Sequence, residues 1–191
     1  CLYTDEQIKV TADLEKQIAQ KIVDLQKNDT IFEQEFVKWH KSEQAKATPW
    51  KTLRPTAIKS NLPKLEVMED DSIYSSGDVT KRDVFDLNFT SDQPITALRL
   101  EALTDDRLPG YGPGRCYYEG RKGTFFLSEV EVKTANGIKV QLSKPIASGG
   151  NGAEKVIDQD GSSGWSSAIG QANHLILPLT NPLPANQSLS I

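Results

Sequence analysis

The segment 155-KVIDQDGSSGWSS-167 concentrates oxygen-bearing side chains in one short stretch. Asp158, Asp160 and Ser163 offer carboxylate and hydroxyl oxygens, and Ca²⁺ collects about six to eight oxygen ligands of this kind in proteins. The spacing does not match an EF-hand loop, which needs a further acidic or amide position and a later glutamate. Because one bend rarely completes the coordination shell, we expect a further carboxylate from another strand. The alternatives are a sugar site and a tight turn with Trp165 in the core behind it.

A second group of carboxylates lies in 125-FFLSEVEV-132, where Glu129 and Glu131 would share one face of a strand. Paired carboxylates catalyse glycoside hydrolysis when their separation fits the reaction. A solvated strand face or a cation ligand is the other interpretation. The two histidines, His40 and His174, are not accompanied by a serine or cysteine in a nucleophile-elbow pattern. We therefore expect this piece not to be an enzyme, and a hydrolase is the least favoured function.

Composition excludes several classes of protein. The 191 residues carry a formal net charge of −4 with acidic and basic residues interspersed, so we expect no nucleic-acid partner. No run of about 18 apolar residues exists, which predicts no membrane span. Cys1 and Cys116 have no neighbouring ligands at zinc or haem spacing, and their pairing in a disulfide stays open. Because the chain begins with cysteine rather than methionine, we expect a processed product or an excised piece.

The first 48 residues are expected to form a helical segment. Apolar residues recur at three- and four-residue steps between Asp5 and Ser42, which predicts an amphipathic helix broken near residues 28–30, where Asp29 or Thr30 would cap a second segment. The helix either packs on its own or a neighbouring domain, or binds a partner. The apolar positions are Ile8, Leu14, Ile18, Ile22, Leu25, Phe32, Phe36 and Trp39.

Residues 49–191 change to short alternating runs separated by turns. The expected strands are 64–69, 83–89, 95–103, 125–132, 138–142, 174–179 and 188–191, with turns at Asp71-Ser72, Asn136-Gly137 and 149-GGNG-152. Short strands without intervening helices predict an all-β fold, an antiparallel β-sandwich or jelly roll. The last expected strand ends with the chain, which indicates truncation at the C-terminus.

The spacing Lys155-x-x-Asp158-x-Asp160-x-x-Ser163-x-Trp165 resembles the K-x-x-D-G-D-x-x-S/T-x-W segment of discoidin-like, galactose-binding-like carbohydrate-binding modules, and 127-LSEVEV-132 resembles their L-A-E-V-E-V strand. In that fold the two segments meet at one structural calcium. The resemblance implies a jelly roll with Trp165 in its core. The implied calcium ligands are the carbonyl oxygens of Lys155 and Ser128 and the side chains of Asp158, Asp160, Ser163 and Glu129.

The sequence departs from those modules in two ways. Gln159 stands where they have glycine, which would change the backbone turn. The glutamate-bearing strand precedes the aspartate loop, whereas it follows the loop in the common modules, so the strand order is permuted. A closed sandwich tolerates such reordering because its termini lie near each other.

Three strings in order, 98-LRLEAL-103, 108-LPGYGPGR-115 and 126-FLSEVEV-132, together with 50-WKTLRPTAIKS-60, resemble the central region of planctomycete-type cytochrome c domain proteins. That region lies between two large uncharacterised domains, often behind a haem-binding CxxCH domain. Since CxxCH is absent from this chain, no haem is implied for it. The resemblance implies flanking domains of the same parent as partners, an exported parent in the periplasm or at the cell surface, and a role in the use of polysaccharides or sulfated glycans.

Sandwich modules that bind sugars stack an exposed aromatic side chain on the sugar ring and add a few polar groups. Tyr111, Tyr117 and Tyr118 in the loop 104–123 are the candidates, and the alternative is that they pack the loop down. Our first hypothesis is a non-catalytic carbohydrate-binding module with a structural calcium. The alternative is a purely architectural module that orients flanking domains and binds no glycan.

Overall fold

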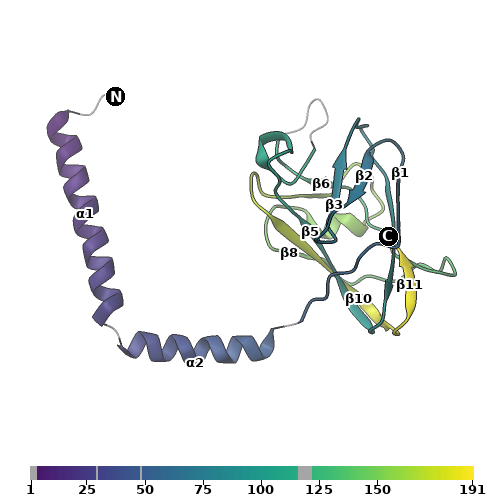
Figure 1. Cartoon of the computed structure of the whole chain (residues 1–191), viewed down its shortest axis with the longest axis horizontal. Coiled ribbons are helices and arrows are strands. Elements are labelled where there is room, and N and C mark those ends of the chain that lie inside the picture. The colour runs from purple at the N-terminus through teal and green to yellow at the C-terminus, as the bar shows by residue number, and fades with distance from the viewer. Residues whose placement is uncertain (1–3, 29, 48, 116–121) are drawn as a thin grey trace. The chain divides into compact units, whose positions relative to one another are not determined.

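The computed structural model describes residues 4–28, 30–47, 49–115 and 122–191. The chain divides into a helical unit, Cys1–Lys51, and a β-rich unit, Thr52–Ile191 (Figure 1). Helix α1 spans Asp5–Asn28 and helix α2 spans Thr30–Lys46, as expected for a helical segment, and Asp29, at the predicted break, lies outside the described residues. Among the described residues, neither helix combines the length and the apolar character needed to cross a bilayer.

Helix α1 begins at a capping box and exposes its apolar side chains. The backbone amide of Gln7 donates to Thr4 Oγ1 at 3.3 Å, and the amide of Thr4 donates to Gln7 Oε1 at 3.0 Å. Two amides that the helix itself leaves without acceptors are satisfied in this way. The predicted apolar positions whose side chains the structure describes lie on the two helices and are exposed: Ile8, Leu14, Ile18, Ile22, Leu25, Phe36 and Trp39.

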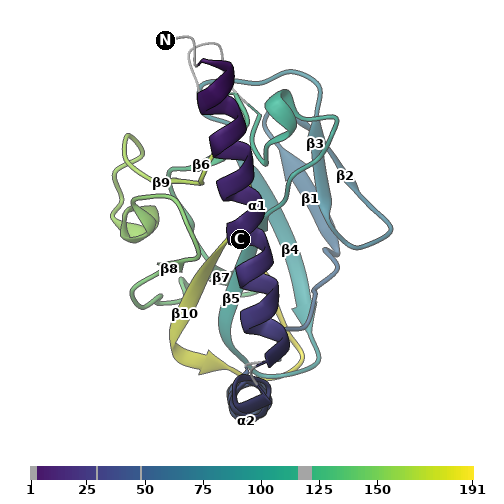
Figure 2. The same ribbon diagram turned by 90° about the vertical axis from the view of Figure 1, so that its left-hand side faces the viewer.

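The described residues of the β-rich unit form two main antiparallel sheets and two small ones (Figures 1 and 2). The four-stranded sheet has the order β1 (Ala57–Ser60), β4 (Phe85–Ser91), β11 (Gln187–Ser190), β7 (Lys133–Thr134). The three-stranded sheet has the order β5 (Ile95–Ala102), β10 (Asn173–Leu183), β8 (Ile146–Ala147). Two-stranded sheets pair β2 (Lys64–Val67) with β3 (Ile73–Ser76), and β6 (Phe126–Leu127) with β9 (Trp165–Ser166). Two 3-10 helices, η1 (Pro109–Tyr111) and η2 (Ala153–Ile157), lie in the connections.

One hydrophobic core joins the two main sheets. Strand β10 alternates along its length, and Leu175, Leu177 and Leu179 are buried. They share a cluster with Leu98 of β5 and Leu189 of β11, which belong to different sheets. Residues on two sheets that bury one common core form a sandwich. The expectation of an antiparallel β-sandwich preceded by helices is confirmed for the class of fold.

Two predicted strands are wrong in extent. Of the expected strand 125–132, only β6 pairs with another strand, β9. Further along, Val130 N donates to Val156 O of η2 at 2.8 Å, so the extended chain there bonds to a 3-10 helix instead of a strand. The expected strand 138–142 makes only isolated bridges, at Lys139 and Leu142. Ile138, the first residue of this expected strand, follows the Gly137 turn directly and is exposed. The alternation of apolar and polar residues predicts which side chains can be buried, but it does not predict where a neighbouring strand is present for backbone hydrogen bonds.

Candidate functional site

The aspartate loop that follows η2 is organised around Asp158. The Asp158 Oδ1 atom accepts a hydrogen bond from Asp160 N at 2.8 Å, and Oδ2 accepts one from Ser163 Oγ at 2.7 Å. These bonds hold the carboxylate in one orientation. The Ser163 hydroxyl, followed by the Asp160 amide, lowers the pKa of Asp158 below its usual range. Asp158 is therefore a fixed and readily ionised carboxylate.

The segment that carries Glu129 lies directly against this loop. Its backbone bonds to η2 through Val130 N and Val156 O, and a Cβ added to Gly164 would lie 2.7 Å from Ser128 Cα. Only glycine permits so close an approach of two backbones. The loop and the segment therefore meet, and the carboxyl groups of Glu129 and Asp158 interact with each other. We call these two groups the Glu129–Asp158 pair.

The two members of the pair have different environments. Glu129 Oε1 is inaccessible to solvent and has no hydrogen-bond partner within the described part of the chain. Burial, followed by the neighbouring Asp158, raises the pKa of Glu129, while the backbone amides of Gln159 and Asp160 oppose that rise. A buried acceptor without a partner is destabilising unless a proton or a cation occupies the position in front of it. The pair therefore has the properties of a site for a proton or a metal ion.

The other predicted ligands lie around the pair but take different roles. Asp160 Oδ1 accepts bonds from Ser162 N at 2.9 Å and Ser162 Oγ at 2.6 Å, so this carboxylate closes its own turn. The carbonyl of Lys155 accepts a bond from Asp158 N at 3.4 Å. In residues 4–28, 30–47, 49–115 and 122–191, no three His, Cys, Asp or Glu side chains gather closely enough to hold a metal ion. The sequence suggested that the carboxylates of Glu129, Asp158 and Asp160 converge, and the structure does not show this.

The donor set that does converge contains oxygen types that bind calcium in proteins. Ca²⁺ combines carboxylates with hydroxyl and carbonyl oxygens, and Glu129, Asp158 and Ser163 provide the first two types. The carbonyls of Ser128 and Lys155 lie on the two segments that meet here. A glycosidase holds its carboxyl groups about 5 Å or more apart and open to substrate. The pair instead consists of interacting groups with a solvent-inaccessible oxygen.

Glu131 is not the partner of Glu129. It forms ion pairs with Lys133 at 2.7 Å and Lys139 at 3.4 Å, and these lower its pKa. The two glutamates of one predicted strand face therefore have separate surroundings. The relevant pair joins residues that are distant in sequence, and no sequence pattern relates them except the resemblance described above.

Gln159 adopts the left-handed conformation, with φ of 68°. Glycine adopts this conformation without strain, whereas glutamine takes it at a cost of about 1–2 kcal/mol. We expect Gln159→Gly to stabilise the β-rich unit by about 0.5–1 kcal/mol, because part of the gain is offset by the entropy of glycine in the unfolded chain. Urea unfolding measures this change. Gln159→Ala retains the strain and is the control, and equal stability of the two variants would contradict the expectation.

Trp165 is the core residue behind the loop, as predicted. It is completely buried, and its Nε1 donates to Gly149 O at 3.0 Å. Its ring meets Phe125 edge to face with the centroids 6.0 Å apart. The tryptophan therefore anchors the loop that carries Asp158 to the sandwich core.

The candidate sugar-contacting residues are only partly described. Tyr111 ends η1 with a left-handed φ of 55°, and 70% of its surface is exposed. Arg115 anchors this loop, since its guanidinium donates to Ser75 Oγ at 3.1 Å and to the carbonyl of Gly77. A strained, exposed aromatic residue on an anchored loop is a candidate binding group. Tyr117 and Tyr118, like Cys116 and Cys1, lie outside the described residues.

Comparison with protein families, with curated protein sequences and with solved structures finds no match to this chain. The chemistry of Glu129, Asp158 and Tyr111 is therefore the basis for a functional assignment.

Proposed function

We propose that the β-rich unit is a non-catalytic carbohydrate-binding module completed by a structural calcium ion. The observation that carries the proposal is the Glu129–Asp158 pair, in which a buried carboxylate oxygen has no partner beside an ionised aspartate. A divalent cation would supply the missing partner and remove the repulsion between the two charges. Glu129, Asp158 and Ser163 would hold the ion, with the Ser128 and Lys155 carbonyls completing the shell. Asp160 would act through the turn rather than as a direct ligand.

The proposed fold is a galactose-binding-like jelly roll with permuted strand order. Two antiparallel sheets around one core and the burial of Trp165 behind the aspartate loop support it. As the sequence resemblance implies, the module would belong to an exported parent protein, periplasmic or at the cell surface, whose flanking domains are its partners. A calcium ion suits that location, because extracellular modules bind calcium with affinities matched to millimolar concentrations.

The exposed Tyr111 supports the carbohydrate part of the proposal. The ring of a tyrosine offers a flat apolar face to a sugar and a hydroxyl for hydrogen bonding. Because 70% of the residue is exposed while the loop around it is anchored, the ring is available without unfolding the loop. A rigid aromatic side chain binds with a small loss of conformational entropy.

Tyr111→Ala should weaken glycan binding by roughly two- to tenfold, because one aromatic contact is lost. Tyr111→Phe, which keeps the ring, should retain most of the affinity. Both variants and the parent protein are tested against a panel of soluble oligosaccharides by isothermal titration calorimetry, with calcium and again with chelator. The absence of glycan binding by folded protein under both conditions would contradict the carbohydrate role.

The architectural alternative rests on helix α1. Its exposed apolar residues, among them Ile18 and Ile22, form a face that suits packing against another protein segment. A chain that binds no glycan but whose α1 face associates with the flanking domains would favour this role. The calcium site is compatible with both functions, since a structural ion stabilises the sandwich in either case.

A further inference from the structure

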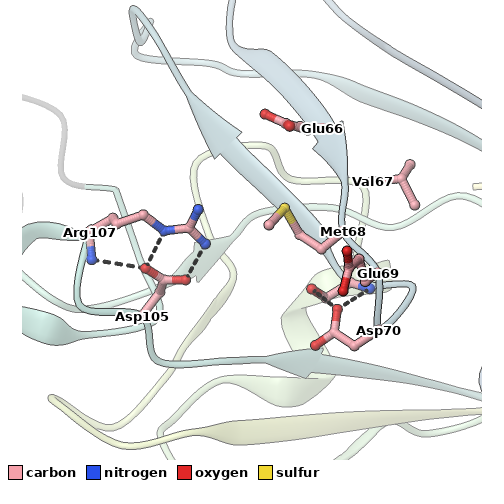
Figure 3. Close-up of a pocket in the computed structure, with 8 residues that line it drawn as sticks. Glu66, Val67, Met68, Glu69, Asp70, Asp105 and Arg107 are labelled. Atoms are coloured by element: carbon pink, nitrogen blue, oxygen red, sulfur yellow. Dashed lines mark hydrogen bonds and ion pairs between the residues drawn. The ribbon is translucent and has the colours of Figure 1, made fainter.

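A hollow lies between the β2–β3 hairpin and the loop that follows β5 (Figure 3). Its volume is about 490 Å³, within the range of roughly 300–1,000 Å³ typical of small-molecule sites. Figure 2 shows β2 and β3 on the opposite side of the β-rich unit from β6 and β9. The hollow is therefore separate from the Glu129–Asp158 pair, which lies beside β6.

Arg107 forms a fixed wall of the hollow. Its guanidinium lies 3.9 Å from the centroid of the Tyr74 ring, and its Nε and Nη2 donate to the Asp105 carboxylate at 2.8 and 2.6 Å. Ring stacking and a bidentate ion pair together hold the planar group in place. These bonds lower the pKa of Asp105 to about 2, so both partners are charged at neutral pH. The remaining terminal nitrogen of Arg107 lies on the side facing Glu66 (Figure 3).

The opposite wall offers acceptors and an apolar contact. Glu66 and Glu69 line the hollow and are exposed, and Met68 lies between the hairpin and Arg107 (Figure 3). Guanidinium donors that face carboxylate acceptors suit the neighbouring hydroxyls of a sugar, which both donate and accept. The adaptable thioether of methionine suits the apolar C–H groups of a sugar ring. The lining therefore has the mixed polar and apolar chemistry of a carbohydrate subsite.

The charge of the lining determines which sugars fit. The positive charge of Arg107 is already paired with Asp105, whereas Glu66, Glu69 and Asp70 also line the hollow and give its lining an excess of negative charge. A hollow whose lining carries an excess of one sign of charge attracts the opposite sign and repels its own. Sulfate or carboxylate groups on a glycan would meet these glutamates directly.

We propose that this hollow is a sugar subsite that binds uncharged glycans and rejects sulfated or uronic ones. The inference rests on the proposed carbohydrate function and adds the place of binding and the charge class of the ligand. It also narrows the expectation from the sequence resemblance, which included sulfated glycans. Tyr111 lies on the same loop as Arg107, four residues further along, so one glycan chain could contact both parts of the loop.

The test uses the full chain in calcium with glucan, galactan and mannan oligosaccharides, each neutral and chemically sulfated. We expect a neutral form to bind, and its sulfated form to bind roughly five- to tenfold more weakly at low salt. The double variant Glu66→Gln/Glu69→Gln should reduce that difference to less than about twofold. Glu6→Gln/Glu15→Gln, with the same charge change on α1, should leave it unchanged. Met68→Trp should fill the hollow and abolish binding.

The outcomes distinguish this inference from the proposed function. Binding that depends on Tyr111 but is unaffected by Met68→Trp would overturn the subsite and leave the carbohydrate role in place. Equal or tighter binding of the sulfated forms would overturn the charge selectivity. No binding of any oligosaccharide by folded protein would overturn both. Circular dichroism verifies the fold of every variant.

Discussion

Glu129→Gln should be more stable than the parent protein in chelator and less stable than the parent protein in calcium. Glu129 Oε1 is inaccessible to solvent and the carboxyl group lies beside Asp158, which disfavours the ionised form of Glu129, and the neutral glutamine removes that penalty in chelator. We expect its melting temperature to rise by about 2–4 °C, which corresponds to about 1 kcal/mol. At a calcium concentration about 100 times the Kd, binding should raise the free energy of unfolding of the parent protein by about 2.7 kcal/mol. The variant should lack most of this gain. Differential scanning fluorimetry in both buffers measures the reversal.

The pH dependence of this effect follows from the direction of the pKa shift. A raised folded-state pKa means that the folded protein binds the proton more tightly than the unfolded chain does. The contribution of protonated Glu129 to the free energy of unfolding is therefore complete below the unfolded-state pKa near 4.5. It is lost as the pH rises through the folded-state pKa. The advantage of Glu129→Gln in chelator should therefore disappear near pH 4. Because calcium displaces the same proton, its affinity should fall by up to about tenfold per pH unit below the folded pKa.

Glu131→Gln is the matched control for this prediction. It makes the same chemical change two residues away, at an exposed side chain paired with Lys133 and Lys139. Surface ion pairs contribute at most about 1 kcal/mol, so we expect a small change that is equal in calcium and chelator. Asp158 is a less informative target, because its two hydrogen bonds within the loop would be lost in both buffers. An identical calcium response of Glu129→Gln and the parent protein would contradict the calcium site.

Trp165→Phe should destabilise the β-rich unit by about 2–3 kcal/mol. The smaller ring leaves a cavity in the core, and Gly149 O loses the hydrogen bond from the indole at 3.0 Å. Trp165→Ala would lose about 3–5 kcal/mol, a large part of the typical total of about 5–15 kcal/mol. Urea unfolding followed by circular dichroism measures the loss.

Fluorescence gives an independent test of the same substitution. Trp39 and Trp50 are 56% and 39% exposed, whereas Trp165 is completely buried, so Trp165 should supply the blue-shifted part of the emission. Trp165→Phe should remove that part, and Trp39→Phe should leave it and change the stability by less than about 0.5 kcal/mol. A loss below about 0.5 kcal/mol for Trp165→Phe would contradict its role as the anchor of the aspartate loop.

Local patterns in the sequence were sufficient for several elements of this protein. Helical periodicity with its interruption near residues 28–30 predicted α1 and α2, since both signals depend only on residues within a few turns of each other. Short β-type runs between turns predicted the strands β5 and β10, and the structure buries Leu175 and Leu177 of β10. The short strands β1, β3, β7, β8 and β9 were not predicted, because they contain too few apolar residues to show a period.

The oxygen-rich loop and Trp165 could also be identified from the sequence, but only the tertiary structure determined how they are used. Contact between η2 and the extended segment selects Glu129 rather than Glu131 as the partner of Asp158, and leaves Asp160 bonded to Ser162. Tertiary contact likewise brings Arg107, which lines the hollow, onto the Tyr74 ring. The physical reason is that residue type and spacing define what a side chain can donate or accept, whereas burial and the neighbours of its charge depend on segments that are far apart in the chain.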